Sequence, residues 1–248
     1  VGTVVTFESG EDSTAVLSGF TLQNGGAVFE GGGIFAINSS PTFNNLIIQN
    51  NSAVNGGAGI HLKYSNSNLN SIIIRNHAGY KGACWFWGAS PTLYNILIHN
   101  NYKGISSEIS GSTVSEPMII NCTIVDNTQG GIKDENSAII TINNSIIWNN
   151  TIQTATSALG SINISNSIVE GGYTDNIDSD PLFVDADNGN YRLSDYSPAI
   201  GAGTNVGAPI TDIDGNPRPN PAGSNPDIGA YENALGTPTQ MTQVINVP

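Results

Sequence analysis

The chain has 248 residues, with 20 acidic residues against 7 basic ones and a formal net charge of −13. This balance argues against general binding to nucleic acids or to anionic membrane surfaces. No apolar run is long enough to cross a bilayer, so we predict no membrane insertion. The chain begins without Met or a signal peptide, and we expect it to be a mature or excised part of a longer secreted protein.

One short phrase recurs along the chain between residues 17 and 171, first as LSGFTLQN and next as FNNLIIQN. A small residue in its third place marks each copy, and successive markers lie 26, 26, 24, 26, 23 and 22 residues apart: Gly19, Asn45, Ser71, Asn95, Asn121, Asn144 and Asn166. Self-similarity at this period is typical of stacked repeats, in which each repeat buries its apolar face against its neighbours.

The content of each repeat predicts strands and turns. The phrases are rich in Ile, Val, Leu and Thr and are bounded by Asn, Gly and Ser. Each repeat adds a second strand-like run, such as GIFAI at residue 33 and GIHLK at residue 59. We therefore predict an all-β chain: a right-handed parallel β-helix of about seven rungs over residues 1–172. An irregular C-terminal cap over residues 173–248 would pack on the last rung.

Two sets of residues have expected places in such a rung. The residue that ends most phrases favours the left-handed conformation, so we expect a ladder of corner side chains at Asn24, Asn50, Asn76, Asn100, Asp126 and Asn149. Cys84 and Cys122 stand where other repeats have Ile, Leu or Phe, which favours buried free thiols, with a disulfide as the alternative.

The C-terminal part changes texture from residue 173 onward. It carries DPLF, YRLS, SPAIGAG, DIDGNPRP and DIGAYE in this order over residues 178–232. This series resembles the C-terminal signature of bacterial secreted β-helix proteins of the choice-of-anchor Q type. The repeats are similar to the broader pectate-lyase-like β-helix superfamily. The resemblance implies an extracellular or surface-anchored protein, with an anchoring segment downstream in the full precursor, but names no activity.

The same C-terminal part holds two short acidic clusters, DADNGN at residue 185 and DIDGN at residue 212. Closely spaced Asp and Asn oxygens suit Ca²⁺, so Asp185, Asp187, Asp212 and Asp214 are calcium candidates. Asp-Gly and Asn-Gly turns produce the same letters without a metal.

Charge is unevenly distributed along the repeats. No acidic residue occurs between Glu30 and Glu108, and that window holds Lys63, Arg75, Lys81, Lys103 and all three histidines, His61, His77 and His99. It also contains Trp85, Trp87, Tyr64, Tyr80, Tyr94 and Tyr102. We expect a local positive field with aromatic side chains on these rungs.

Stacked rungs convert sequence positions into outward columns. One column is expected to contain Phe35, His61, Trp85, Ser106 and Lys133, and its neighbour Ile37, Lys63, Trp87, Glu108 and Glu135. A third is expected along Gln23, Gln49, Arg75, His99, Val125, Trp148 and Glu170. Aromatic faces stack on sugar rings, and cations and amides bind sugar oxygens. The candidates for substrate binding are Phe35, Gln49, Tyr64, Lys81, Trp85, Trp87 and Trp148.

Four functions compete on these residues. A monomeric binder of an acidic polysaccharide needs only the aromatic and cationic face. A polysaccharide lyase would add a base and an acid to the cations, drawn from Lys63, Arg75, His61 and His99. A glycoside hydrolase would use Glu108 and Glu135, expected about 5 Å apart on neighbouring rungs. A non-enzymatic adhesin or spacer is the remaining alternative.

Overall fold

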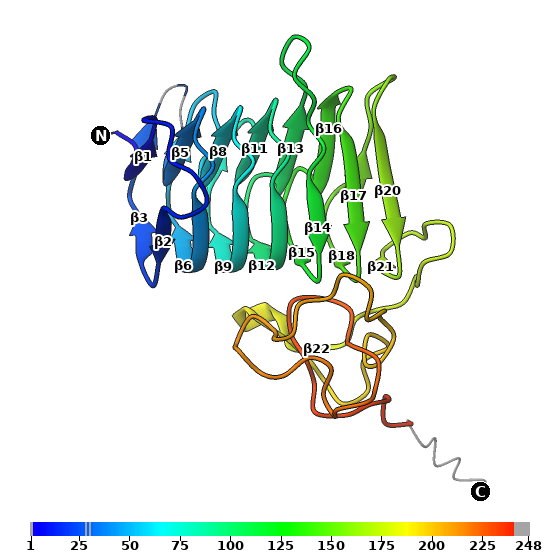
Figure 1. Cartoon of the computed structure of the whole chain (residues 1–248). Coiled ribbons are helices and arrows are strands. Elements are labelled where there is room, and N and C mark those ends of the chain that lie inside the picture. The colour runs from blue at the N-terminus through cyan, green and yellow to red at the C-terminus, as the bar shows by residue number, and fades with distance from the viewer. Residues whose placement is uncertain (1, 28, 30, 241–248) are drawn as a thin grey trace, which may run out of the picture.

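The computed structural model describes residues 2–27, 29 and 31–240 and shows short parallel strands coiled into a solenoid (Figure 1). A single 3-10 turn, η1 (Ala186–Asn188), is the one helical element of these residues. None of their helices is long or apolar enough to cross a membrane. The predicted all-β parallel β-helix is confirmed.

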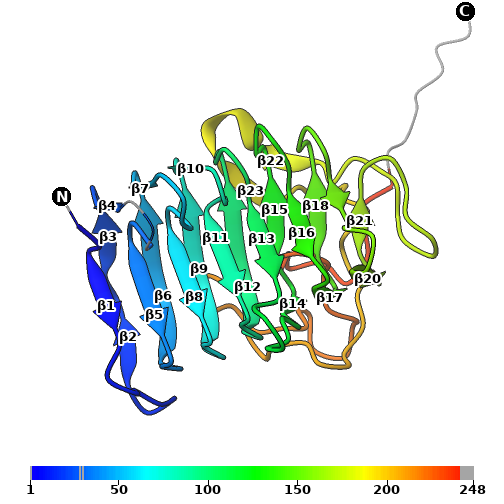
Figure 2. The same cartoon turned by 90° about the horizontal axis from the view of Figure 1, so that it is seen from above.

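One face of the solenoid is a seven-stranded sheet, here called sheet A, to which each rung contributes one strand (Figure 2). Its strands pair in parallel in the order β1 (Val5–Phe7), β5 (Ile34–Ile37), β8 (Ile60–Lys63), β11 (Cys84–Trp87), β13 (Ile105–Glu108), β16 (Ile132–Asn136) and β19 (Thr154–Ala155).

The other large sheet, sheet B, is bent across its strands, at the repeat markers. Three rungs cross it with one long strand each: β6 (Thr42–Gln49), β9 (Asn68–Arg75) and β12 (Thr92–His99). The other rungs use two short strands. One half contains β2 (Val16–Ser18), β14 (Met118–Ile120), β17 (Ile139–Asn143) and β20 (Ser161–Ser165). The other half contains β3 (Thr21–Gln23), β15 (Thr123–Val125), β18 (Ile146–Trp148) and β21 (Ile168–Val169).

Two small sheets complete the strands. Sheet C, on the way back from sheet B to sheet A, pairs β4 (Gly26–Ala27), β7 (Ser52–Ala53) and β10 (Ala78–Gly79). An antiparallel pair lies in the C-terminal segment, β22 (Phe183–Asp185) with β23 (Asn190–Leu193).

Left-handed residues make the corners between the sheets. The repeat markers bend sheet B in this conformation, with φ of 51° at Asn45 and 54° at Asn95. The phrase-ending residues turn the chain toward sheet C in the same way, with φ of 53° at Asn50 and 55° at Asp126. Asn and Gly adopt this region at low cost, which explains why they recur at a fixed period.

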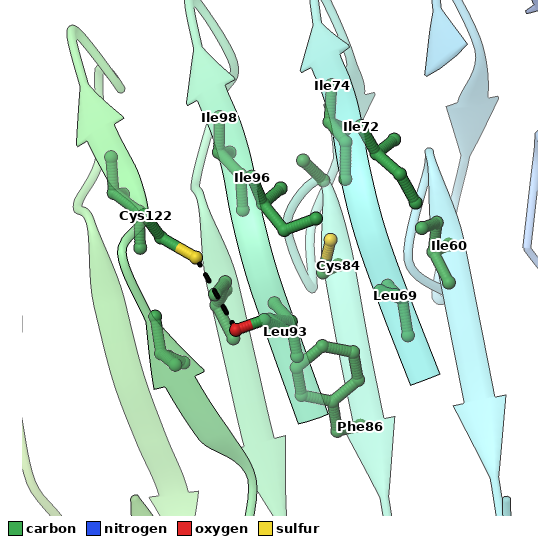
Figure 3. Close-up of a cluster of buried hydrophobic side chains, with 14 of the residues drawn as sticks. Ile60, Leu69, Ile72, Ile74, Cys84, Phe86, Leu93, Ile96, Ile98 and Cys122 are labelled. Atoms are coloured by element: carbon green, nitrogen blue, oxygen red, sulfur yellow. Dashed lines mark hydrogen bonds between the residues drawn. The ribbon is translucent and has the colours of Figure 1, made fainter. Parts of the chain in front are cut away.

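The space inside the rungs is filled by stacked apolar side chains. Ile34, Ile60, Cys84, Ile105 and Ile132 form one inward column of sheet A and are almost fully buried. Both cysteines are free thiols in this core, as predicted (Figure 3). Burial raises the pKa of Cys122 to about 12, so neither thiol is a nucleophile candidate.

A buried polar ladder runs beside this core, one residue later than predicted. The expected residues, such as Asn50, do take the left-handed conformation. The buried side chains that bond from rung to rung belong to the following residues: Asn51, His77, Asn101, Asn127 and Asn150. In this ladder the side chain of one rung accepts a hydrogen bond from the backbone N–H of the rung before it, for example Asn127 N to Asn150 Oδ1 at 3.1 Å.

His77 replaces asparagine in the ladder and is held neutral. Its Nδ1 lies 3.2 Å from both the backbone N–H and the carbonyl oxygen of Asn51, and its Nε2 lies 3.0 Å from the carbonyl oxygen of Ile48. A proton on Nε2 is accepted by Ile48, while Nδ1 accepts from the Asn51 N–H or, when protonated, donates to the Asn51 carbonyl. Burial lowers the pKa of His77 to about 4, with the two backbone contacts acting in the opposite direction.

The C-terminal segment lies along the flank of sheet B (Figure 1). Residues 173–178 do contact the last rung, where Ile177 pairs with Ile168. We expected the whole segment there, as a cap over the open end. Its residues 179–240 instead cover outward apolar side chains of sheet B, which would otherwise face water. The shared cluster contains Leu97, Val125, Ile146 and Ile168 from the sheet and Tyr191, Leu193, Ile228 and Tyr231 from the segment.

Three repeat markers hold the segment in place. Asn95 Nδ2 donates to the carbonyl of Thr211 at 2.9 Å, and Asn144 Nδ2 donates to that of Thr204 at 2.8 Å. Between them, Asn121 donates to the carbonyl of Asp227 at 3.0 Å. These repeat markers thus supply the donors that fix an irregular backbone. The division of the chain at residue 172 remains a prediction.

Inside the segment, a buried ion pair joins distant parts of the chain. Arg218 Nε lies 3.2 Å from Glu232 Oε2, and both side chains are inaccessible to water. Arg218 also donates from Nη1 to the carbonyl of Gly229 at 3.1 Å. Burial raises the pKa of Glu232 to about 7, against the lowering effect of the Arg218 charge. Removing one partner leaves the other as an unpaired buried charge.

We predict that His77→Asn makes the fold less sensitive to acid. The unfolded ring titrates near its ordinary pKa of 6.5 and the folded ring at about 4. His77 therefore contributes its full share of stability above pH 6.5, and that share is lost as the pH falls from 6.5 toward 4. At pH 5 the loss is about 2 kcal/mol.

Urea midpoints at pH 7 and pH 5 should differ less for the His77→Asn variant than for the wild type. His77→Ala, which orphans the Asn51 N–H, should be less stable at both. An unchanged difference for His77→Asn would contradict the assignment.

We predict that Arg218→Met detaches the C-terminal segment while the solenoid persists. An uncompensated buried carboxylate costs about 3–5 kcal/mol. Proteases should then cut within residues 179–240, with the β-sheet circular dichroism retained. The matched control is Arg192→Met, because the Arg192–Asp214 pair is largely exposed and is worth about 1 kcal/mol or less. Equal protease resistance of the two variants would argue against this role for Arg218.

Candidate functional site

The outer surface of sheet A carries the aromatic and basic side chains predicted for it. The observed register aligns Phe35 with His61, His61 with Trp85, and Trp85 with Ser106, which continues to Lys133. The neighbouring column aligns Ile37, Lys63, Trp87 and Glu108. These two predicted columns are confirmed except at Glu135.

The rings of these columns stack on one another in what we call the aromatic row, which comprises Phe35, His61, Trp85, Trp87 and Tyr64. Ring centroids of His61 and Trp85 are 4.2 Å apart with an interplanar angle of 21°. Trp85 and Trp87 are 5.3 Å apart and nearly parallel, at 7°. Tyr64 extends the row beyond Trp87, 6.4 Å away at 29°.

Stacking covers much of this row, contrary to the expectation of two exposed tryptophans. Trp85 is only 6% exposed, with His61 over one part of its ring and the Lys81 ammonium 5.1 Å from its centroid. Trp87 is half-buried, and Tyr64 is 37% exposed. The accessible end of the row is therefore Trp87 and Tyr64. Sequence alone placed Trp85 on the outer face but could not show how closely its neighbours cover it.

His61 is almost fully buried within the row, at 1% exposure. Burial is the main cause that lowers its pKa to about 3, and the Lys63 and Lys81 charges lower it further. Its ring is neutral at neutral pH and is a weak base. His61 is suited to packing in the row rather than to removing a proton from a substrate.

The cations of the region differ in their partners. Lys81 pairs with Glu108 at 3.2 Å, and Lys103 pairs with Glu135 at 3.3 Å. Lys63 has no carboxylate partner among the described residues, and its Nζ lies 4.0 Å from the centroid of Trp87 and 5.6 Å from that of Tyr64. The free positive charge of sheet A thus lies at the accessible end of the row.

The remaining predicted site residues lie on sheet B, on another face of the solenoid. The column Gln23, Gln49, Arg75, His99, Val125 and Trp148 has the predicted register. Arg75 Nε and Nη2 both donate to Gln49 Oε1, at 3.0 and 2.9 Å. His99 lies beneath Tyr191 of the C-terminal segment, with ring centroids 4.9 Å apart, and burial lowers its pKa to about 4.

Trp148 is likewise distant from the aromatic row. It lines a cavity of about 280 Å³ between sheet B and the C-terminal segment, together with Val125, Asp126 and Phe183. The Tyr191 hydroxyl donates to the carboxylate of Asp126, one of the residues that line this cavity, at 2.5 Å.

The two catalytic sets proposed from sequence are not assembled. Lys63 and His61 lie on sheet A, whereas Arg75 and His99 lie on sheet B, so one sugar ring cannot contact all four. The sequence could not reveal this because both strands of each rung show the same alternation.

For the hydrolase pair, a bulge after Ser107 shifts the register, and Glu108 aligns with Asn136 instead of Glu135. Both carboxylates are held by lysines, and the Lys103 and Lys133 partners contribute to lowering the pKa of Glu135 against the effect of its burial.

Three of the four calcium candidates have other partners, and the fourth, Asp187, lies in η1. Asp212 is buried, and its oxygens accept backbone N–H groups of Asp214, Asn216 and Glu232. Asp214 pairs with Arg192, and Asp185 accepts from Asn188 Nδ2. In the described part of the chain, no group of three or more His, Cys, Asp or Glu side chains could hold a metal ion. Asp214 and Gly215 lie in a turn, in which the Gly215 N–H donates to the carbonyl of Asp212 at 3.1 Å.

Two aromatic side chains of this region were not among the predicted binding residues. Tyr80 and Tyr102 are both exposed, and the Lys103 ammonium lies 5.0 Å from the Tyr80 centroid. The available signal in the sequence was the pair of small residues before Tyr80, Ala78 and Gly79.

The comparisons with known proteins agree with the geometry. A family model described as a right handed beta helix region matches residues 6–178. Neither a curated protein nor a solved structure matches the chain. The matched residues make up more than half of the chain and include every strand of sheets A, B and C except β1's first residue. The chain therefore belongs to the right-handed β-helix family.

Proposed function

We propose that this protein binds an acidic polysaccharide on the outer face of sheet A, outside the cell, without cleaving it. The observation that carries the proposal is the Lys63 ammonium, which lies 4.0 Å over the ring of Trp87 beside the exposed Tyr64. Here a cation and apolar ring surface are available to one ligand.

The chemistry of an acidic sugar matches both groups. Its carboxylate or sulfate would pair with the Lys63 ammonium, while its C–H surface would contact the accessible edge of Trp87 and the ring of Tyr64. The Tyr64 hydroxyl already bonds Ser110 Oγ at 2.6 Å, which fixes the ring next to the lysine. A preorganised site of this kind loses little side-chain freedom on binding.

Binding without cleavage is supported by the positions of the acids and bases. His61 is buried and weakly basic, and the carboxylates of Glu108 and Glu135 on the neighbouring rungs are paired with Lys81 and Lys103. A lyase or hydrolase needs an accessible base or acid within hydrogen-bond reach of the bond. The resemblance of residues 178–232 to secreted, anchored proteins supports an extracellular location.

We predict that Lys63→Ala and Trp87→Ala each weaken retention on polygalacturonate or alginate. Loss of one partly exposed ion pair or aromatic contact should reduce affinity about three- to tenfold. The matched control is Arg75→Gln, which removes one positive charge on sheet B and keeps an amide beside Gln49. Affinity electrophoresis in gels containing each polymer measures the effect, with circular dichroism to verify the fold.

Two results would contradict this proposal. Equal weakening by Arg75→Gln would mean that retention follows net charge and not the sheet A site. Absence of retention on any acidic polymer would favour an adhesin that recognises something else, or a structural spacer.

We also predict no bond cleavage. Incubation of the wild type with either polymer, with or without Ca²⁺, should give no ultraviolet absorbance from unsaturated uronates and no new reducing ends. A rise in absorbance that Lys63→Ala abolishes would establish a lyase and overturn the non-catalytic part of the proposal.

A further inference from the structure

An open hollow lies next to the aromatic row, on the side of sheet C. Its volume is about 280 Å³, and its lining residues are Ala53, Ala78, Gly79, Tyr80 and Tyr102. Tyr80 is 63% exposed and Tyr102 is 42% exposed. Two large apolar rings in contact with water on a soluble protein call for an explanation.

Small neighbours leave the ring of Tyr102 open. The backbone N–H of Tyr102 donates to the carbonyl of His77 at 3.1 Å, the same bond that aligns successive strands of sheet C. Tyr102 therefore takes the position that Ala78 and Ser52 take in the two preceding rungs. These short side chains cannot cover an aromatic face. In the aromatic row the corresponding neighbours are rings, and they cover Trp85.

Two lysines connect Tyr80 with the side chains of sheet A. Lys81 follows Tyr80 directly, and its ammonium reaches the ring of Trp85 at 5.1 Å. The Lys103 ammonium lies 5.0 Å from Tyr80. Both ammonium groups are paired with glutamates, at 3.2 and 3.3 Å. The hollow thus offers ring faces with little net charge, whereas the Lys63 ammonium has no carboxylate partner among the described residues.

We propose that this hollow is a second subsite for the same polysaccharide, in which Tyr80 and Tyr102 stack on the C–H face of a sugar ring. This inference rests on the proposed function and adds a division of roles. The Lys63 end binds the acidic group of one sugar by charge, and the tyrosine hollow binds another sugar by apolar contact.

The two subsites lie within reach of one oligosaccharide. Tyr80 and Trp87 are seven residues apart in the chain, which spans at most about 25 Å. An oligosaccharide of several units can therefore contact both. Because the hollow lacks a free charge, its contribution to affinity should not depend on salt, whereas that of Lys63 should.

The test measures the affinity for polygalacturonate at several salt concentrations. Tyr80→Ala and Tyr102→Ala should each weaken binding about three- to tenfold at every salt concentration and keep the wild-type salt slope. Lys63→Ala should reduce the slope. Tyr80→Phe keeps the ring and should bind like the wild type. Tyr196→Ala is the matched control, since Tyr196 is a similarly exposed tyrosine of the C-terminal segment.

The outcomes separate the two proposals. If both tyrosine variants bind with wild-type affinity and Lys63→Ala binds more weakly, the hollow is not a subsite, and the proposed site on sheet A stands. Equal weakening by Tyr196→Ala would also overturn the hollow as a specific subsite. No binding by the wild type at any salt concentration would overturn the proposed function itself.

Discussion

The structure depends on one constraint: each rung must place its backbone in parallel register with the rung before it. Corner residues then stack on corner residues, as Asn45 does on Gly19, and inward isoleucines stack on isoleucines, as Ile60 does on Ile34. A corner in the left-handed region is tolerated because Asn and Gly adopt it readily. The hydrogen bonds between rungs and the buried apolar columns both follow from this register.

The same constraint creates the surface. A side chain on sheet A has its equivalents in the neighbouring rungs a strand spacing away, so what it contacts is decided by residues about 25 positions distant in the chain. Where the equivalents are large, as at His61 and Trp85, the rings stack and bury one another. Where they are small, as at Ala78 beneath Tyr102, the ring stays open. The accessibility of each ring is a property of its column.

The fold and most of the surface register could be predicted because the signals were local and repeated. The period, the Gly and Asn corners and the two-residue alternation each appear several times, so an error in one copy is corrected by the others. The inward column containing Cys84 and the outward column containing Trp85 were both placed correctly for this reason.

The predictions that failed involve events that occur once. The bulge beside Ser107, which separates Glu108 from Glu135, has no counterpart between the other rungs as far as the structure describes them. Alternation also cannot tell which sheet a column belongs to, so residues of sheets A and B were combined in one catalytic set. The docking of the C-terminal segment on sheet B depends on contacts such as Asn144 with Thr204, between chain positions without any periodic relation.

The position of the C-terminal segment has a consequence for how a long ligand would meet this protein. The segment packs on sheet B, and the strands of sheet A run side by side along the length of the solenoid (Figure 2). A polymer lying on sheet A could therefore enter at its middle, since it would not need to present a chain end. Neighbouring copies of the protein could then occupy successive stretches of one polymer, and the number bound would increase with polymer length. Such a protein would bind along the whole length of a polymer and would not recognise its chain ends.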